Sequence, residues 1–289
     1  MTPEVAVADE PVESVPLDAQ AALRALGRRR ARRRGYVWLV RVVILAVVLI
    51  SWQLTSGHLF PAFIMSSPSQ VWDQLTNWLS NGYILDNLGV TLKETFIGFF
   101  AGTLIGAAAG VLIGLSKFAS DVLSPFINAL YAVPKIMLGP LFVVWFGIDL
   151  TMKATLAGLF VVFIVFYNIW TGVQEVDKDL VEMYRVMGGS RWAIITGIYL
   201  PSAMSWLFNS LRLAFPVALI GATVGEFVAS SEGLGYVATN AATQADTAGV
   251  FVAVIVVTVV AVAMDQVIVL IQRMVNVRLG KTDGGRLVI

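Results

Sequence analysis

The chain of 289 residues contains no cysteine and only one histidine, His58. Without cysteine it has no thiolate nucleophile, iron–sulfur cluster or disulfide, and a lone histidine cannot build a zinc site. Charge is also scarce: Asp, Glu, Lys and Arg make up 13% of the residues, whereas hydrophobic residues make up 57%. A typical globular domain carries about 25% charged residues. With a mean hydropathy of +0.79, the composition indicates a protein of the lipid bilayer.

Complete nucleotide-binding or hydrolase motifs are missing as well. Residues 280–282 (GKT) resemble the end of a phosphate loop, but its first glycine would fall at Val275 and no strand precedes it. Residues 233–238 (GLGYVA) match G-x-G-x-x-A, yet they follow an apolar segment of membrane length instead of a strand. No metalloprotease or serine-hydrolase motif is present. We therefore expect no enzyme activity, no cofactor, no metal and no nucleic-acid partner for this chain.

What the sequence does contain is apolar segments long enough to cross a bilayer, which takes about 20 residues. There are six, at residues 36–54, 95–115, 122–146, 155–173, 205–229 and 250–271. We predict an all-α membrane protein with six transmembrane helices. The predicted domains are a disordered tail at 1–34, a transmembrane domain at 35–272 with a long internal loop at 174–204, and a second tail at 273–289.

The distribution of basic residues predicts the orientation. Eight of the 20 Lys and Arg residues lie in or just before the first apolar segment, whereas loops 55–92 and 230–249 contain none. Loop 174–204 and the C-terminal tail do carry basic residues. By the positive-inside rule, both termini and loop 174–204 are cytoplasmic and the other two loops lie outside. Because no small-residue cleavage site follows the first segment, we predict a retained anchor in a multi-pass cell-membrane protein.

A row of glycines marks the second predicted span. Residues four apart lie along one shallow ridge of a helix, so glycines at this spacing let another helix approach the backbone closely. The pattern predicts a compact bundle in which this ridge is a packing surface. The glycines are Gly98, Gly102, Gly106, Gly110 and Gly114.

Charged residues within spans need an explanation, since each costs about 2.5–3.5 kcal/mol at the bilayer centre. Lys135, next to Pro134, is a pathway candidate that would attract an anion, or a lysine that snorkels or pairs with a carboxylate. Arg212 is a further candidate, although its position favours snorkelling. Glu226 either helps to close an external gate or is a solvated or helix-pairing carboxylate, and Asp265 is expected to make an inter-helix hydrogen bond. Aromatic residues could line a solute site or form interfacial belts: Tyr131, Trp145, Tyr167 and Trp170.

The segment between the fourth and fifth predicted spans is too polar for a span and too apolar for a solvated loop. Asp177 can cap a short helix, which Gly188 and Gly189 can end. Ser190 can cap a second helix that runs to a break at residues 200–201. The apolar side chains of this hairpin indicate a face that docks either on the lipid interface or on a soluble partner.

The spacing in this hairpin resembles the E-A-A-x-x-x-G-x9-I-x-L-P signature of the membrane subunits of binding-protein-dependent ABC importers. Met183 and Tyr184 stand where the family usually has two alanines. Over residues 87–279 the chain is similar to permeases of the nitrate, sulfonate and taurine type, in TLKETFIGFFAGTLIG, AVPKIMLGPLFVVWFG, GGSRWAI and GEFVASSEGLGYV. The positions that match the signature are Glu182, Gly188, Ile198, Leu200 and Pro201.

The resemblance implies a type I importer fold and alternating-access import of a small anion, sulfonate- or taurine-like, or another small organic molecule. It implies a second permease copy as a homodimer, two cytoplasmic ATPase subunits that bind ATP and Mg, and an extracytoplasmic substrate-binding protein. A coupling helix within residues 177–201 would sit in a groove of the ATPase. An ion- or proton-coupled secondary transporter, for which we find no internal repeat, and a non-transporting scaffold are the alternatives. The implied coupling residues are Glu182, Met183, Tyr184, Met187, Gly188, Gly189, Arg191, Ile198, Leu200 and Pro201.

Overall fold

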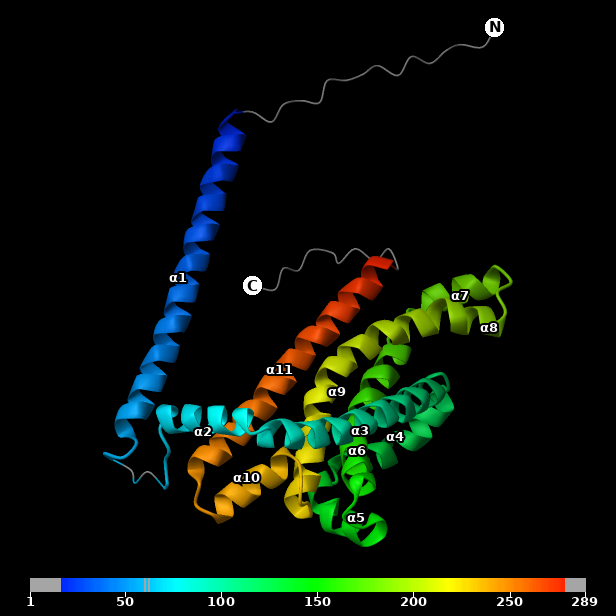
Figure 1. Ribbon diagram of the computed structural model, residues 1–289. Coiled ribbons are helices and arrows are strands. Elements are labelled where there is room, and N and C mark those ends of the chain that lie inside the picture. Colours follow the sequence, from blue (N-terminus) through cyan, green and yellow to red (C-terminus); the bar gives the residue numbers. More distant parts are fainter. Residues whose placement is uncertain (1–16, 60, 62, 279–289) are drawn as a thin grey trace. The chain divides into compact units, whose positions relative to one another are not determined.

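The computed structural model describes residues 17–59, 61 and 63–278, and every regular element in these ranges is a helix (Figure 1). The chain divides into two compact units, residues 1–60 and 61–289, which we treat separately. The tail residues 1–16 and 279–289, including the GKT sequence at 280–282, lie outside the described residues. The predicted all-α fold is confirmed for the described part of the chain.

The first unit contains one long helix, α1 (Leu17–Thr55). Its apolar part, residues 33–55, is long enough to cross a membrane. Residues 17–34 were predicted to be disordered, and this prediction is wrong because they are helical. The segment is rich in Ala, Leu and Arg, which favour helix. Extending an existing helix costs little once the first turn has formed.

The second unit contains the remaining helices, four of which are long and apolar enough to span a membrane. These four are α3, α6, α11 and the continuous run from α8 through η2 to α9. The elements are α2 (Pro68–Ser80), α3 (Tyr83–Gly114), α4 (Lys117–Ala132), the 3₁₀ helix η1 (Lys135–Leu138), α5 (Gly139–Phe146), α6 (Leu150–Gln174), α7 (Lys178–Val186), α8 (Arg191–Ile194), the π-helix η2 (Ile195–Tyr199), α9 (Leu200–Val228), α10 (Leu234–Thr243) and α11 (Thr247–Arg278).

The third predicted span is not one straight helix. It is a pair, α4 followed by η1 and α5, bent by 77° at the break. Pro134 has no backbone N–H and disfavours helical backbone in the residue before it. Val133 accordingly has extended backbone, with φ −60° and ψ 127°. The bend turns the chain within the apolar region and exposes the segment that carries Lys135.

Both loops predicted to lie outside contain helices. In the first, α2 begins at a capping box. The Ser67 hydroxyl accepts a hydrogen bond from the backbone N–H of Gln70, and the side-chain oxygen of Gln70 accepts one from the backbone N–H of Ser67. In the second, α10 buries Leu234, Val237 and Ala241. These helices are too short to span a membrane. The helix α2 packs on α3 and α11, and α10 packs on α9 and α11.

The glycine ridge of α3 lies directly against α6. A β-carbon at Gly98 would be 2.5 Å from the carbonyl oxygen of Ala154, and one at Gly102 would be 2.6 Å from that of Gly158. The three later glycines of the row meet α6 in the same way, at progressively later residues. Only glycine permits this approach, and the two helix backbones are therefore in contact over several turns.

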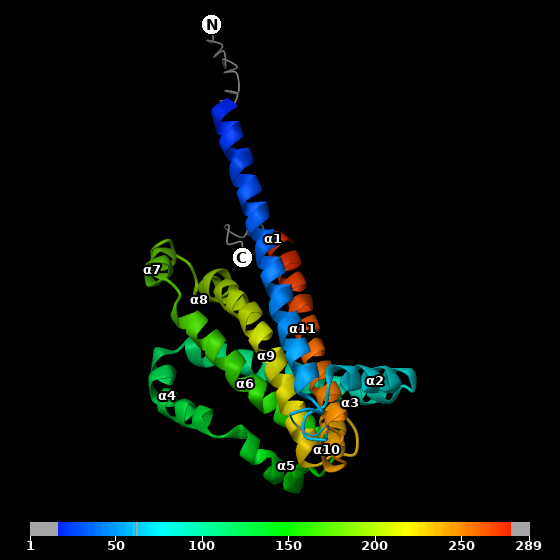
Figure 2. The ribbon, with the colours of Figure 1, turned by 90° about the vertical axis from the view of Figure 1, so that its left-hand side faces the viewer.

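The apolar core lies where α3, α6 and α9 meet. Phe215 of α9 is fully buried and its ring contacts those of Phe96 and Phe99 on α3. Val161 and Val165 of α6 belong to the same cluster. The α7–α8 hairpin lies at one end of this bundle and α5 and α10 lie at the other (Figure 2). The two ends therefore present different surfaces to whatever the protein meets there.

Candidate functional site

The α7–α8 hairpin forms as its sequence predicts at both caps. The Asp177 carboxylate accepts from Asp179 N at 2.9 Å, and the Ser190 hydroxyl accepts from Ala193 N at 3.1 Å. Gly188 adopts φ +83°, where other residues are strained. Its N–H donates to Arg185 O, and the N–H of Gly189 donates to Tyr184 O. The two glycines thus end α7 and reverse the chain.

The second helix of the hairpin does not end at residues 200–201, and the predicted break there is wrong. It continues through the π-helix η2 into α9 as one element. Pro201 lies in the first turn of α9, where its missing N–H interrupts the hydrogen-bond pattern. A π-turn immediately before it provides the local widening that absorbs such an irregularity. The hairpin is therefore joined rigidly to a membrane-spanning helix.

The hairpin has a small core and an exposed apolar end. Val181, Ile194 and Ile198 are buried against one another. By contrast Val186 is 89% exposed, Met187 77% and Trp192 73%. Together with Met183, which is 51% exposed, these side chains form what we call the hairpin tip. So much exposed apolar surface at a turn is typical of a docking surface.

Tyr184 has a structural place in the hairpin that its neighbour Met183 lacks. A β-carbon at Gly197 would lie 3.7 Å from Oη of Tyr184, so the ring lies over this glycine of the π-helix. Tyr184 is therefore accommodated between the two helices of the hairpin. Met183 points to the exposed side and adds to the hairpin tip.

A cavity of about 270 Å³ lies beside the break between α4 and α5. The Lys135 ammonium group donates to Tyr131 O at 2.9 Å. It also lies 4.6 Å from the centroid of the Tyr131 ring and 4.7 Å from that of Phe163, which stabilises the cation. The ring of Tyr131 in turn contacts Tyr167. Lys135 is the only cationic residue among those that line this cavity, and its walls are otherwise apolar or aromatic.

The other charged candidates have protein partners. Arg212 makes a two-point contact with Asp265 of α11, with Nε–Oδ1 2.9 Å and Nη2–Oδ2 3.3 Å. The inter-helix bond predicted for Asp265 is confirmed, and its partner is Arg212.

Of the aromatic candidates, Trp170 contacts the ring of Tyr167. Trp145 instead packs within α5, on Phe142 and Phe146.

Glu226 lies in a buried polar network at the end of the bundle away from the hairpin. It is 1% exposed. Its Oε1 accepts from the Thr91 hydroxyl at 2.6 Å and its Oε2 accepts from Gly235 N. The two preceding backbone amides are held as well, since Leu234 N donates to Thr91 Oγ1 and Gly233 N donates to Asn87 Oδ1. The network fastens the start of α10 to α3 and α9.

A second ion pair extends this network to α6. Lys153 Nζ lies 2.9 Å from Oε1 of Glu94, with side-chain exposures of 8% and 1%. Lys153 also donates to the Ser230 hydroxyl at 2.7 Å, and that hydroxyl donates to Glu232 O. We call Glu94, Lys153 and Glu226, with Asn87 and Thr91, the buried cluster. It ties three spanning helices to one turn.

Sequence reasoning missed every member of the buried cluster except Glu226. The available signal was that Glu94 and Lys153 stand within two residues of the starts of predicted spans, at 95 and 155. Both residues fall just outside the predicted spans, whereas α3 begins at Tyr83 and α6 at Leu150. Both charges therefore lie inside helices.

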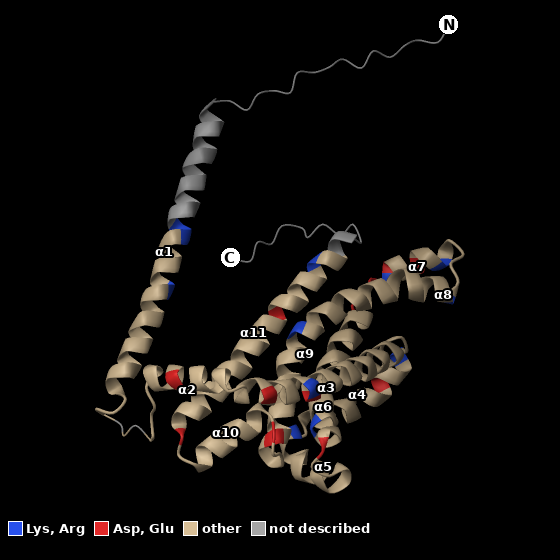
Figure 3. Cartoon of the chain, in the orientation of Figure 1, with Lys and Arg blue, Asp and Glu red and all other residues tan. Residues whose placement is uncertain are grey.

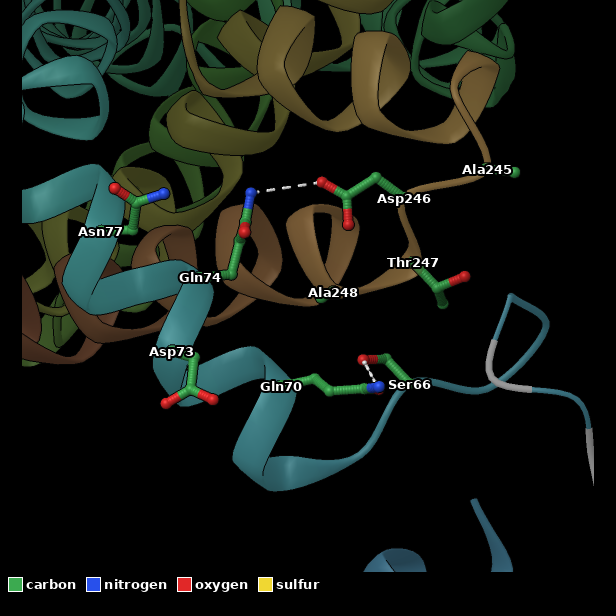
Figure 4. Close-up of a pocket in the computed structure, with 9 residues that line it drawn as sticks. All are labelled: Ser66, Gln70, Asp73, Gln74, Asn77, Ala245, Asp246, Thr247 and Ala248. Carbon is green, nitrogen blue, oxygen red and sulfur yellow. Dashed lines mark hydrogen bonds between the residues drawn. The ribbon is translucent and has the colours of Figure 1, made fainter. Parts of the chain in front are cut away.

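A polar groove of about 430 Å³ lies between α2 and the turn that leads into α11 (Figure 4). Gln74 of α2 donates to Asp246 at 3.3 Å across it, and Asp246 also accepts from Gly249 N at the start of α11. Asp73 lines the same groove and points away from this bond in the close-up. The lining contains two carboxylates and no basic residue, so the groove favours cationic groups. Charge is sparse over the rest of the helices (Figure 3).

Comparison with known proteins now gives the family. Residues 102–280 match the binding-protein-dependent transport system inner membrane component. The chain belongs to this family. It is thus the permease subunit of an ABC importer, a multi-pass inner-membrane protein that carries solute and leaves ATP hydrolysis to a separate subunit. This result decides for the importer and against the secondary transporter and the scaffold.

Individual relatives agree with the assignment. SsuC of Escherichia coli (strain K12), named for the transport of aliphatic sulfonates, is 35% identical over 75% of this chain and 84% of its own length. The riboflavin transport permease RibX of Chloroflexus aurantiacus is 35% identical over 73% of this chain and 79% of its own. The formylaminopyrimidine transport permease ThiX of Halalkalibacterium halodurans is 26% identical. The substrates named for these relatives differ in charge and size.

Two solved structures share the fold. A chain of an amino acid ABC transporter superposes on 71% of the permease and 97% of its own length, with TM-score 0.55 and 20% identity. A chain of the MetNI methionine transporter in an inward-facing conformation covers 64% of the permease and 94% of its own length, with TM-score 0.52 and 19% identity. At this identity the match shows the type I importer permease fold alone.

Proposed function

We propose that the permease takes its energy from a separate ATPase through the hairpin tip, and that it carries a small organic anion. The exposure of Val186, Met187 and Trp192 carries the first part of the proposal. Apolar side chains at a turn favour a docked partner because their burial releases water, about 25 cal/mol per Å². The continuous helix from α8 through η2 to α9 offers a rigid route from that partner to the core.

The partners follow from the same role. We infer a homodimer of the permease, two ATPase subunits that bind ATP and Mg on the cytoplasmic side, and an extracytoplasmic substrate-binding protein. The basic residues of the hairpin and the lack of basic residues in loops 55–92 and 230–249 support placing the hairpin and both termini in the cytoplasm. In this arrangement the buried cluster and the polar groove lie at the outer end. Closure of the ATPase pair would then move the two hairpins and reorient the permease halves.

Trp192→Asp tests the docking role. We expect wild-type permease, purified by a tag in mild detergent, to bring down an ATPase subunit that peptide mass spectrometry identifies. The variant should lose this subunit, because a carboxylate would be desolvated in an apolar interface. Trp72→Asp is the matched control, since Trp72 is 65% exposed but belongs to α2, which lies away from the hairpin (Figure 1). Retention of the ATPase by Trp192→Asp, or equal loss in both variants, would refute the docking site.

The cavity beside Lys135 supports the choice of an anion. One ammonium group among aromatic and apolar walls suits a solute with an anionic head and an apolar body. Aliphatic sulfonates, for which SsuC is named, have this chemistry. The five other pathway and aromatic candidates have other partners or other positions, so we assign solute contact to Lys135 and Tyr131 alone.

Lys135→Met tests the solute class. A hydrogen bond to a charged group is worth about 1.5–3 kcal/mol, so uptake of a radiolabelled alkanesulfonate by cells with the complete transporter should fall about 10- to 100-fold. Lys135→Arg should retain part of the uptake because it keeps the charge. Lys117→Met, which removes an exposed cation at the start of α4, should leave uptake unchanged. Equal uptake by Lys135→Met and wild type would exclude Lys135 from the solute pathway.

A further inference from the structure

The buried cluster does not balance in charge when each of its groups takes its usual form. It contains two carboxyl groups, Glu94 and Glu226, and one ammonium group, Lys153, all of them buried. With both carboxyl groups ionised the cluster would carry one net negative charge. An uncompensated charge away from water costs several kcal/mol. The buried cluster therefore needs one more positive charge to be neutral.

The hydrogen bonds show where that charge is missing. Oε1 of Glu94 pairs with Lys153, but Oε2 of Glu94 is fully buried and has no hydrogen-bond donor among the described residues. Glu226 approaches α3 at Thr91, whose hydroxyl donates to it at 2.6 Å, and Glu94 lies one turn further along the same helix. Two neighbouring buried carboxylates repel, whereas a carboxylic acid and a carboxylate can share a hydrogen bond. One proton between them would give Oε2 of Glu94 a hydrogen bond and would also neutralise the cluster.

We propose that Glu94 and Glu226 form a binding site for one proton, which completes the fastening of the α9–α10 turn to α3 and α6. The charged groups that face one another here are Glu94 of α3, Lys153 of α6, Glu226 of α9 and Glu232 of the turn. The start of α10 contributes the Gly235 amide to Glu226. A cavity of about 490 Å³ lies beside Glu94 and Lys153, and the other charged residues that line it, Lys93, Asp149 and Glu232, are exposed.

The site has a mechanical consequence. Glu226 holds the Gly235 amide, and Lys153 holds Ser230 at the other side of the same turn. Loss of the proton would set two carboxylates against each other beneath the turn. The bound proton thus stabilises the attachment of this turn to α3 and α6, at the end of the bundle opposite the hairpin. Its release would weaken that attachment.

Infrared spectroscopy of the purified permease tests the site directly. The wild-type protein at neutral pH should show the carbonyl stretch of a protonated carboxylic acid, which disappears as the pH is raised. Glu226→Gln and Glu94→Gln should each lack it, because either change leaves one carboxylate to balance the one ammonium group of the cluster and removes the need for a proton. Difference spectra against Glu175→Gln, an exposed acid at the end of α6, should contain no such band. Its absence from wild type minus either cluster variant would overturn the proposal.

Thermal stability gives an independent measurement. Each single variant should melt near the wild type, since the glutamine amide can donate the hydrogen bond that the proton supplies. The double variant Glu94→Gln with Glu226→Gln should melt lower than either, because Lys153 is then a buried cation in a cluster without a carboxylate. Single variants as unstable as the double variant would show that both carboxylates are needed in ionised form, and would contradict the bound proton.

Discussion

Gly102→Leu is expected to remove most of the folded permease from the membrane. A β-carbon at this position would be 2.6 Å from the Gly158 carbonyl oxygen and 2.8 Å from Cβ of Val161. These are atoms of the facing helix and cannot rotate away, so α3 and α6 must separate along the whole ridge. Overpacking of a core costs about 1–3 kcal/mol even where side chains can adjust. Here the cost should exceed that range.

A tagged permease is heated, and fluorescence-detected size-exclusion chromatography then measures how much monodisperse protein remains. Gly89→Leu is the matched control: the same change, on the same helix, at a position where a β-carbon meets nothing within 4 Å. It should be neutral or stabilising, because glycine costs about 0.8–1.0 kcal/mol relative to alanine within a helix. If the two variants behave alike, the ridge is not the packing surface that we infer.

Gly188→Pro is expected to reduce ATP-driven uptake to background while the permease stays folded in the membrane. Proline fixes φ near −65°, whereas Gly188 has φ +83°. The change also removes the N–H that donates to Arg185 O. The reversal between α7 and α8 would be lost, and with it the presentation of the hairpin tip. No other side chain surrounds Gly188 within 4 Å of a β-carbon, so the core of the bundle is spared.

Uptake and ATP hydrolysis by proteoliposomes that contain the complete complex would measure the effect. Gly188→Asn is the control, because asparagine tolerates left-handed backbone better than other residues with a β-carbon. It should keep most of the uptake. Normal solute-stimulated uptake by Gly188→Pro would mean that the hairpin does not couple the permease to the ATPase. Normal size-exclusion profiles for both variants are needed to attribute the loss to coupling.

Local signals in the sequence were sufficient for several features. The caps at Asp177 and Ser190 and the glycine turn at Gly188 depend on residues within a few positions of one another, and the structure has all three. The spans were recognised because apolar length is a property of a single segment. The signature from Glu182 to Pro201 identified the family for the same reason, since it is a matter of spacing along one chain.

Features that depend on contacts between elements were harder to predict from the sequence. Residues 122–146 have the composition of a span, but Pro134 bends them, and composition does not record an angle. Residues 200–201 have the composition of a break, but the π-turn of η2 lets the helix continue. Helix ends were the weakest point, because polar residues in the first turns of α3 and α6 become compatible with burial only when another helix provides their partners.

The sequence by itself determined that this chain lies in a membrane as a bundle of helices, that it has no phosphate loop of its own, and that a capped hairpin interrupts its spans. These properties are set by composition and by spacing over short distances. Only the tertiary structure decided that Glu94, Lys153 and Glu226 meet, because they come from three helices whose approach depends on the glycine ridge of α3. Burial then changes the chemistry of those charges, and burial is a property of the packed bundle.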